Sequence, residues 1–182
     1  MREVVIDTET TGLNHKLGDR IIEVGCVEIQ NYIPTGKTLQ FYCRPDKSIS
    51  EDYAGLQDAH KMVRSLIEKY SDNHEIIIGG FSQGAALSLS YQFEKSSKIK
   101  ACIALSGYMP NIDNYKNKSV VGAKIFIAHG KSDNVITFES YKKTINFLES
   151  KCDDIHKYVG DFGHTITKEV TTEMTDWISK II

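Results

Sequence analysis

The sequence predicts an α/β fold in two parts: a three-layer arrangement around a mainly parallel sheet over residues 51–182, and a β-rich segment over residues 1–50. Beyond residue 50, short apolar runs alternate with amphipathic stretches, the rhythm of strand–helix–strand units in a parallel sheet. Before residue 45, apolar side chains recur at every second position, as in half-buried strands. The turn-forming residues 44–48 (Arg-Pro-Asp-Lys-Ser) interrupt the pattern, so we expect a boundary near residue 50 between two domains.

The N-terminal segment is expected to contain three strands. Residues 4–6 form a short apolar run, and every second side chain is apolar in residues 20–29 and again in residues 39–43. Residues 33–36 (Ile-Pro-Thr-Gly) have turn chemistry and separate the last two stretches. The pattern predicts a hairpin or a meander.

The remainder of the chain is expected to alternate strands and helices. Its strand candidates are continuous apolar runs, as expected of strands buried on both faces. Its helix candidates have apolar side chains on one face only. The expected strands lie near residues 75–80, 101–106, 123–129 and 154–159, and the expected helices near residues 56–70, 83–94, 138–150 and 170–181.

Composition and charge exclude several classes of protein. Hydrophobic residues make up 41% of the 182 residues and charged residues 25%, and the formal net charge is -2 with no basic block, so we expect no nucleic-acid partner. No apolar run approaches the roughly 20 residues of a transmembrane helix, and the N-terminus lacks the apolar core of a signal peptide. We therefore expect a cytoplasmic protein without a transmembrane segment. Four cysteines lack metal-binding spacing and are expected to be buried free thiols: Cys26, Cys43, Cys102 and Cys152.

The strongest local signal is the run from Gly79 to Gly84 (Gly-Gly-Phe-Ser-Gln-Gly), which contains G-x-S-x-G between an apolar strand and an alanine-rich helix. A nucleophile elbow requires this context, because its serine sits on a sharp, strained turn. Small residues at Gly80 and Gly84 let the strand and the helix approach closely, and the helix N-terminus directs N–H groups at the reacting oxygen. Ser82 is therefore the candidate nucleophile, and the backbone N–H of Gln83 is the candidate donor to an oxyanion.

A serine nucleophile needs a base, and the base needs an acid that fixes its tautomer. In elbow-containing folds the order along the chain is serine, acid, histidine. Asp133 follows the expected strand that ends near residue 129, and His164 follows the last expected strand. Since ligands bind at the carboxyl ends of strands in an open α/β sheet, we expect the three side chains to meet there.

Each of these residues also has a structural interpretation. Ser82 alone suits a turn, Asp133 a solvated loop, and His164 the start of a helix. Their joint occurrence in this order favours the catalytic interpretation. We expect a structural rather than a catalytic role for His129, and we interpret the other histidines as incidental: His15, His60, His74 and His156.

These motifs resemble those of the carboxylesterase/phospholipase family of α/β-hydrolases, which includes the acyl-protein thioesterases. The matching pieces are residues 79–84, 105–108, 129–133 and 162–164, and the resemblance runs from about residue 54 to the C-terminus. It implies a truncated α/β-hydrolase that hydrolyses a small acyl ester or thioester without a metal or cofactor. One departure is Ile136, where the family often has proline.

The resemblance also implies that part of the usual fold is missing. Family members have further strands before the elbow and a loop that donates a second N–H to the oxyanion, and nothing before residue 75 resembles that loop. Losing one donor typically lowers the rate about 10²–10³-fold, so we expect weakened activity. The elbow strand would also have an open apolar edge through which the chain could form oligomers. We expect the N-terminal strands to pack against or beside that edge.

The first 47 residues resemble a different family, the DEDD-type 3′–5′ exonucleases, which includes the bacterial proofreading epsilon subunit. The matching stretches are residues 4–13, 19–28 and 34–46. This resemblance implies that Asp7 and Glu9 are two of four carboxylates that would hold paired Mg²⁺ or Mn²⁺ ions.

The other two carboxylates are not found in context. His156 and Asp161 have the H-x-x-x-x-D spacing of the last exonuclease motif, but that motif belongs on a helix and residues 158–160 are poor helix formers, so we interpret the spacing as accidental. Three hypotheses follow, in this order: a serine ester hydrolase weakened by truncation, a metal-dependent exonuclease remnant, and a catalytically silent fusion protein.

Overall fold

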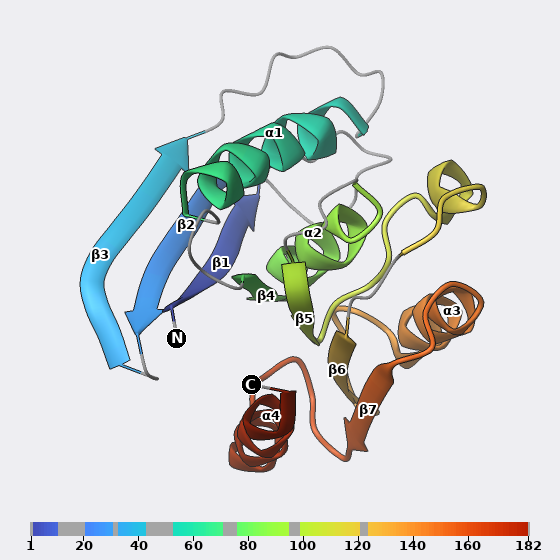
Figure 1. The fold of residues 1–182 in the computed structure, drawn as a ribbon. Helices are drawn as coiled ribbons and strands as arrows, with labels where there is room; N and C mark the ends of the chain where they lie inside the picture. Colours follow the sequence, from blue (N-terminus) through green and yellow to red (C-terminus); the bar gives the residue numbers. More distant parts are fainter. Residues whose placement is uncertain are drawn as a thin grey trace.

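The computed structural model of the protein describes residues 2–10, 21–30, 33–42, 53–70, 76–94, 99–120 and 124–181. The described residues form a seven-stranded sheet in the order β3-β2-β1-β4-β5-β6-β7, flanked by helices (Figure 1). The strands are β1 (Arg2–Thr10), β2 (Ile21–Gln30), β3 (Ile33–Tyr42), β4 (Ile76–Phe81), β5 (Ile99–Leu105), β6 (Lys124–Gly130) and β7 (Ile155–Gly160). The helices are α1 (Tyr53–Tyr70), α2 (Gln83–Tyr91), the 3-10 helix η2 (Ile112–Tyr115), α3 (Phe138–Glu149) and α4 (Lys168–Ile181).

Strands β4 to β7 are parallel neighbours, which confirms the mainly parallel sheet expected from the apolar runs. Their observed bounds differ from the expected ones by one or two residues. Because parallel strands place their carboxyl ends at one edge of a sheet, the loops that follow β4, β6 and β7 all leave from that edge. The candidate residues Ser82, Asp133 and His164 lie in these three loops.

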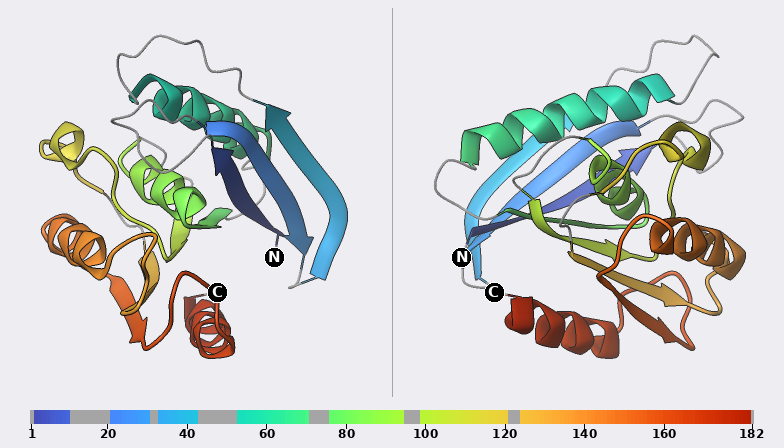
Figure 2. Two further views of the ribbon diagram at one scale, coloured as in Figure 1. Left: turned by 180° about the vertical axis from the view of Figure 1, so that it is seen from behind. Right: turned by 45° about the vertical axis from the view of Figure 1, so that its right-hand side comes forward.

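Two buried apolar clusters cover the two faces of the parallel sheet. Strand β4 contributes to both, because successive side chains of a strand point to opposite faces. Ile76 and Ile78 belong to the cluster that includes side chains of α1, α2 and α3. Ile77 belongs to the other cluster, together with Trp177 and Ile178 of α4. Figures 1 and 2 show α4 on the opposite side of the sheet from α1 and α2, which gives the three expected layers.

The N-terminal strands extend this sheet. β1 pairs antiparallel with β2 and parallel with β4, where Val4 lies opposite Ile78 and Val5 opposite Gly79. β2 pairs antiparallel with β3. The edge of β4 that was expected to be open is therefore occupied by β1, and the expectation that the N-terminal strands pack beside it is confirmed.

One local expectation in this segment is wrong. Residues 33–36 were expected to form a turn, but they begin β3, with Ile33 opposite Gln30 and Pro34 opposite Ile29. Strand β3 lies at the edge of the sheet, where proline is tolerated because one side of the strand makes no ladder hydrogen bonds. Gly36 takes a positive φ of 79° within the strand.

Cys102 and Cys152 are buried free thiols, as expected, and burial raises the pKa of the Cys152 thiol to about 11. The side chain of Cys26 and the whole of Cys43 lie outside the described residues. Across the described part of the chain, no helix combines the length and the apolar character that crossing a membrane requires.

A buried polar cluster joins α1 to α2. His60 is 1% exposed, and its Nε2 lies 2.8 Å from the Oγ of Ser90. The Ser90 hydroxyl itself donates to the carbonyl of Leu87, so the imidazole donates at Nε2. Its Nδ1 faces a carboxylate oxygen of Glu94 at 3.7 Å. Burial lowers the pKa of His60 to about 4, although Glu94 favours the charged ring, so His60 is neutral at pH 7.

We expect His60 to make the protein less stable as the pH falls from 6.5 toward about 4. In that window the unfolded chain binds a proton on this histidine and the folded chain does not, so the free energy of unfolding falls with falling pH. The shift corresponds to about 3 kcal/mol. Glu94, Lys118 and Arg64 are the charged groups that act on the ring, and the last two oppose its protonation.

Urea denaturation of the wild-type protein and of His60→Phe, at pH values above and below this window, measures the effect. The variant should be less stable at neutral pH and should lose less stability on acidification. An equal loss in both proteins would show that His60 does not cause the pH dependence.

Candidate active site

Ser82 lies on a sharp turn between β4 and α2, as the elbow motif predicts. Its backbone has φ 56° and ψ -112°, a region that residues with a side chain rarely adopt. The conformation is held by its neighbours: the N–H of Ser82 donates to the carbonyl of Leu105 at 2.8 Å, and its carbonyl accepts from Ala86 at 3.1 Å. Hydrogen bonds to β5 on one side and to the first turn of α2 on the other therefore stabilise the strained backbone conformation of Ser82.

Two glycines allow the close packing around this turn. A Cβ atom at Gly80 would lie 2.3 Å from the carbonyl carbon of Gly84, and a Cβ atom at Gly107 would lie 2.3 Å from the Cβ of Ala85. Both distances are far below van der Waals contact. A side chain at Gly80 would therefore collide with the backbone of Gly84, whereas the need for glycine at Gly107 was not evident from the sequence.

We expect Gly80→Ala to destabilise the protein by about 1–3 kcal/mol or more, because the added methyl group must push α2 away from β4. Thermal unfolding measures this as a lower Tm. Gly163→Ala is the matched control, since its Cβ would lie at an ordinary 3.7 Å from the carbonyl oxygen of Ser132. Equal Tm values for the two variants would contradict the packing argument.

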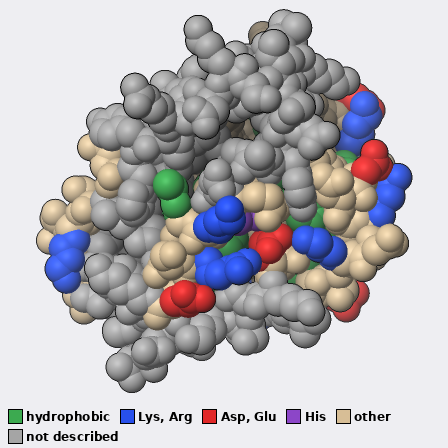
Figure 3. Space-filling model, turned by 90° about the horizontal axis from the view of Figure 1, so that it is seen from above, with side chains coloured by type: hydrophobic (Ala, Val, Ile, Leu, Met, Phe, Trp, Pro, Cys, Tyr) green, Lys and Arg blue, Asp and Glu red, His purple; other side chains and the backbone are tan. Residues whose placement is uncertain are grey.

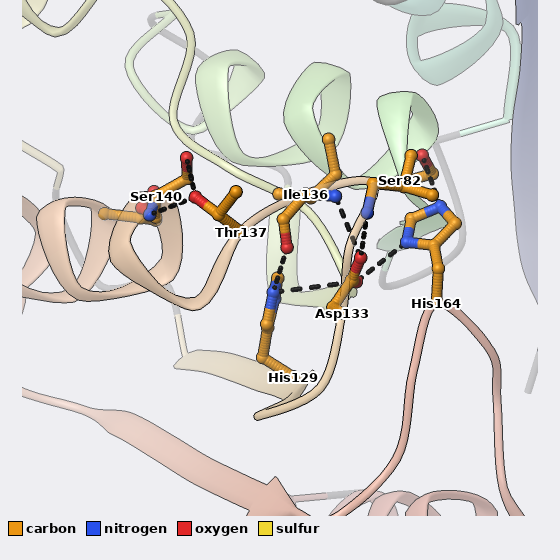
Figure 4. A network of polar contacts seen from close by, with 9 residues as sticks. Ser82, His129, Asp133, Ile136, Thr137, Ser140 and His164 are labelled. Carbon is orange, nitrogen blue, oxygen red and sulfur yellow. Dashed lines mark hydrogen bonds and ion pairs between the residues drawn. The ribbon is translucent and has the colours of Figure 1, made fainter.

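The structure brings Ser82, His164 and Asp133 together in the order that general-base catalysis requires (Figure 4). His164 Nε2 lies 3.0 Å from the Ser82 Oγ, and His164 Nδ1 lies 2.8 Å from Asp133 Oδ2. A carboxylate only accepts, so the proton of the neutral ring is on Nδ1, and Nε2 is free to accept from the serine hydroxyl. The ring of Phe81 lies against the imidazole, with 4.7 Å between centroids.

Asp133 is buried, and three hydrogen bonds hold its carboxylate. Its Oδ1 accepts from the N–H groups of Val135 at 2.9 Å and Ile136 at 2.8 Å. Its Oδ2 accepts from His164 and lies 3.6 Å from Nε2 of His129. Burial alone would raise the pKa of Asp133, but the hydrogen bonds from His164, Ile136 and Val135 outweigh it and lower that pKa. The acid is therefore ionised and rigidly placed.

The departure at Ile136 has a structural consequence. A proline at this position would have no N–H to donate. Here the Ile136 N–H contributes one of the two bonds to Asp133 Oδ1. Ile136 itself is 8% exposed and points into the protein.

Gln83 is the first residue of α2. Its backbone N–H therefore belongs to the first turn of the helix, next to Ser82, where the positive end of the helix dipole favours negative charge. The donation of this N–H to an oxyanion stays a prediction.

One face of the molecule carries both signs of charge. Figure 3 shows one face of the molecule, on which basic side chains lie beside acidic ones around a small area of histidine. The loops that carry Asp133 and His164 are joined by an exposed ion pair between Lys131 and Asp161 at 3.1 Å.

The residues of the exonuclease-like motif are only partly described. Asp7 and Glu9 lie on β1, opposite Gly25 and Glu23, and their side chains lie outside the described part of the structure. Among the described residues there is no group of three or more His, Cys, Asp or Glu side chains that could hold a metal ion.

His156 and Asp161 do not form part of an exonuclease motif. His156 is on strand β7 rather than on a helix, and its Nε2 lies 2.8 Å from a carboxylate oxygen of Glu173. Asp161 follows the same strand and pairs with Lys131. The spacing between the two residues is accidental, as expected.

The family described as phospholipase/carboxylesterase matches residues 43–182, which is most of the chain. A second family, described as exonuclease, matches residues 4–70 and overlaps the first over residues 43–70. The DNA polymerase III subunit epsilon of Rickettsia felis is 42% identical over 52 residues, which are 29% of this chain and 23% of that protein.

Two curated relatives illustrate the longer match. The acyl-protein thioesterase 1 of Debaryomyces hansenii is 31% identical over 143 residues, covering 72% of this chain and 61% of the relative. The acyl-protein thioesterase 1 of Yarrowia lipolytica is 32% identical over 144 residues, covering 73% and 63%. The chain thus spans less than two thirds of the length of these relatives.

Solved structures show the same fold at low identity. The acyl-protein thioesterase 2 of Zea mays superposes with a TM-score of 0.64 at 18% identity, over 76% of this chain and 70% of that one. The Bacillus cereus carboxylesterase superposes with a TM-score of 0.61 at 18% identity, over 85% of this chain and 72% of that one. The sheet and its helices are therefore arranged as in an α/β-hydrolase.

Proposed function

Because this chain belongs to the phospholipase/carboxylesterase family, we propose that it hydrolyses small acyl esters or thioesters, with Ser82 as nucleophile, His164 as general base and Asp133 as the acid that orients the base. The observation that carries the proposal is the continuous chain of contacts from Ser82 Oγ to His164, at 3.0 Å, and from His164 to Asp133, at 2.8 Å. The strained turn at Ser82 supports it, because such strain is typical of a nucleophile elbow.

The geometry suits a two-step acyl transfer. His164 Nε2 takes the proton of Ser82 as Oγ bonds to the carbonyl carbon, and Asp133 stabilises the imidazolium that forms. The tetrahedral intermediate collapses as His164 returns the proton to the leaving alcohol or thiol, which gives an acyl-serine. A water molecule then repeats the sequence, with His164 again taking a proton, and releases the carboxylic acid.

Negative charge on the carbonyl oxygen needs a donor in both steps. The backbone N–H of Gln83 is the proposed donor, at the positive end of α2. Every proton in this scheme moves among the triad, the substrate and water, so the proposal invokes no metal and no cofactor. We also propose a cytoplasmic location, because the buried free thiols of Cys102 and Cys152 suit a reducing compartment.

Labelling by a fluorophosphonate probe tests the proposal, because the probe reacts with serines that an adjacent base activates. We expect the native protein to be labelled, and to hydrolyse a short-chain acyl ester and the matching thioester. Heat-denatured protein is the control. A folded protein that is neither labelled nor active on either substrate would support a catalytically silent fusion instead.

A further inference from the structure

His129 lies directly behind Asp133 and has no part in the proton transfers proposed above. It is the next-to-last residue of β6, and its side chain is completely buried. Its Nε2 lies 2.8 Å from the carbonyl oxygen of Ile136 and 3.6 Å from Asp133 Oδ2 (Figure 4). The ring therefore touches the loop that supplies the acid of the triad.

The contacts of His129 define its tautomer. A carbonyl only accepts, so Nε2 carries the proton of the neutral ring, and Nδ1 has no hydrogen-bond partner among the described residues. The ring stacks on Tyr141, with 5.1 Å between centroids, and lies 6.4 Å from Phe138. Burial in these surroundings lowers the pKa of His129. The ring is thus neutral and directs its single proton at the loop.

This proton holds the backbone of Ile136 at its carbonyl, while Asp133 holds the same residue at its N–H. The Ile136 carbonyl accepts from His129, and its N–H donates to Asp133 Oδ1 at 2.8 Å. At 3.6 Å, the Nε2 of His129 is too far from Asp133 Oδ2 for a hydrogen bond. The positive end of its N–H dipole nevertheless faces Oδ2, the oxygen that accepts from His164. Oδ1 therefore depends on a residue that His129 keeps in place, and Oδ2 faces the His129 ring itself.

We propose that His129 is a positioning residue for the triad: through the backbone of Ile136 it fixes the rotation of the Asp133 carboxylate, and through that carboxylate the orientation of His164. The inference rests on the proposed function of the triad. The Asp133 N–H also ties the start of this loop to β6, at 3.3 Å from the Gly130 carbonyl, so losing the His129 bond would release the far end of the loop at Ile136. A shift of about 1 Å in a catalytic group can cost about 10²-fold in rate.

Two substitutions separate the hydrogen bond from the bulk of the ring. His129→Phe keeps an aromatic ring against Tyr141 but removes the donor, whereas His129→Gln keeps an N–H donor of similar reach. We expect His129→Phe to lower kcat by about 10–100-fold with little change in KM, and His129→Gln to recover most of the loss. His60→Phe, at another buried histidine, is the matched control and should lower stability without lowering the kcat of the folded protein.

Proton NMR of the imidazole N–H between His164 and Asp133 gives a readout that does not need turnover. We expect a downfield resonance in the wild-type protein, its loss or a clear upfield shift in His129→Phe, and its retention in His129→Gln and His60→Phe. If His129→Phe leaves this resonance unchanged, the inference is overturned, whether or not the protein is active. Absence of labelling and hydrolysis in the wild type would count against the proposed function alone.

Discussion

Replacing Ser82 with alanine is expected to abolish fluorophosphonate labelling and to lower kcat on a short acyl ester by on the order of 10⁴-fold or more. The Ser82 Oγ lies 3.0 Å from the base and is the atom that bonds to the carbonyl carbon in the proposed mechanism. Alanine provides no nucleophile, while the N–H of Gln83 and the binding surface remain. Substrate binding should therefore change much less than kcat.

The comparison needs a serine substitution outside the site. Ser179 on α4 is exposed, and its hydroxyl donates to the carbonyl of Asp176 in the same helix, so Ser179→Ala should leave labelling and kcat unchanged. Labelling of Ser82→Ala at the wild-type level would place the reactive serine elsewhere and end the triad hypothesis.

Deleting residues 1–48 is expected to make the remaining chain insoluble or strongly oligomeric. β1 pairs with β4 on the side away from β5, so its removal exposes the backbone of Ile76–Phe81 along an apolar strand. An exposed, hydrophobic strand edge is a template for pairing with other chains. Any esterase activity of the full chain should disappear with the deletion, because the elbow that presents Ser82 ends the same strand.

Size-exclusion chromatography with light scattering, with the full-length protein as control, measures the result. A soluble and monomeric 49–182 fragment with the activity of the full chain would contradict the prediction. The fragment would then not need the N-terminal strands to cover the edge of β4.

Much of the fold after residue 53 could be predicted, because each element is encoded by its own side chains. The apolar run at Ile76–Ile78 predicted a strand buried on both faces, and its side chains do divide between the two clusters. Prediction failed at residues 33–36, where proline and glycine indicated a turn and the chain forms an edge strand. Turn chemistry is a local preference, and pairing with β2 overrides it.

The candidate triad was also predictable from the sequence, whereas the contacts that hold the triad in place were not. G-x-S-x-G, and the order Ser82, Asp133, His164, identify the groups that could react, because each follows a recognisable strand. His129 was predicted to have a structural role. The sequence does not show which groups its ring contacts. Its bond to the Ile136 carbonyl depends on the path of the loop between residues 130 and 137, which no motif specifies.

By itself, the sequence determined which segments form strands and helices and which side chains could carry out acyl transfer. Both follow from residues that are close together in the chain, through periodicity and spacing. The sequence also led us to expect the N-terminal strands against or beside the edge of β4, but only the tertiary structure decided that β1 is the strand that joins it and that the pairing is parallel. Strands pair through backbone N–H and C=O groups that every residue except proline supplies, so no pattern within residues 2–10 identifies the neighbour that β1 joins.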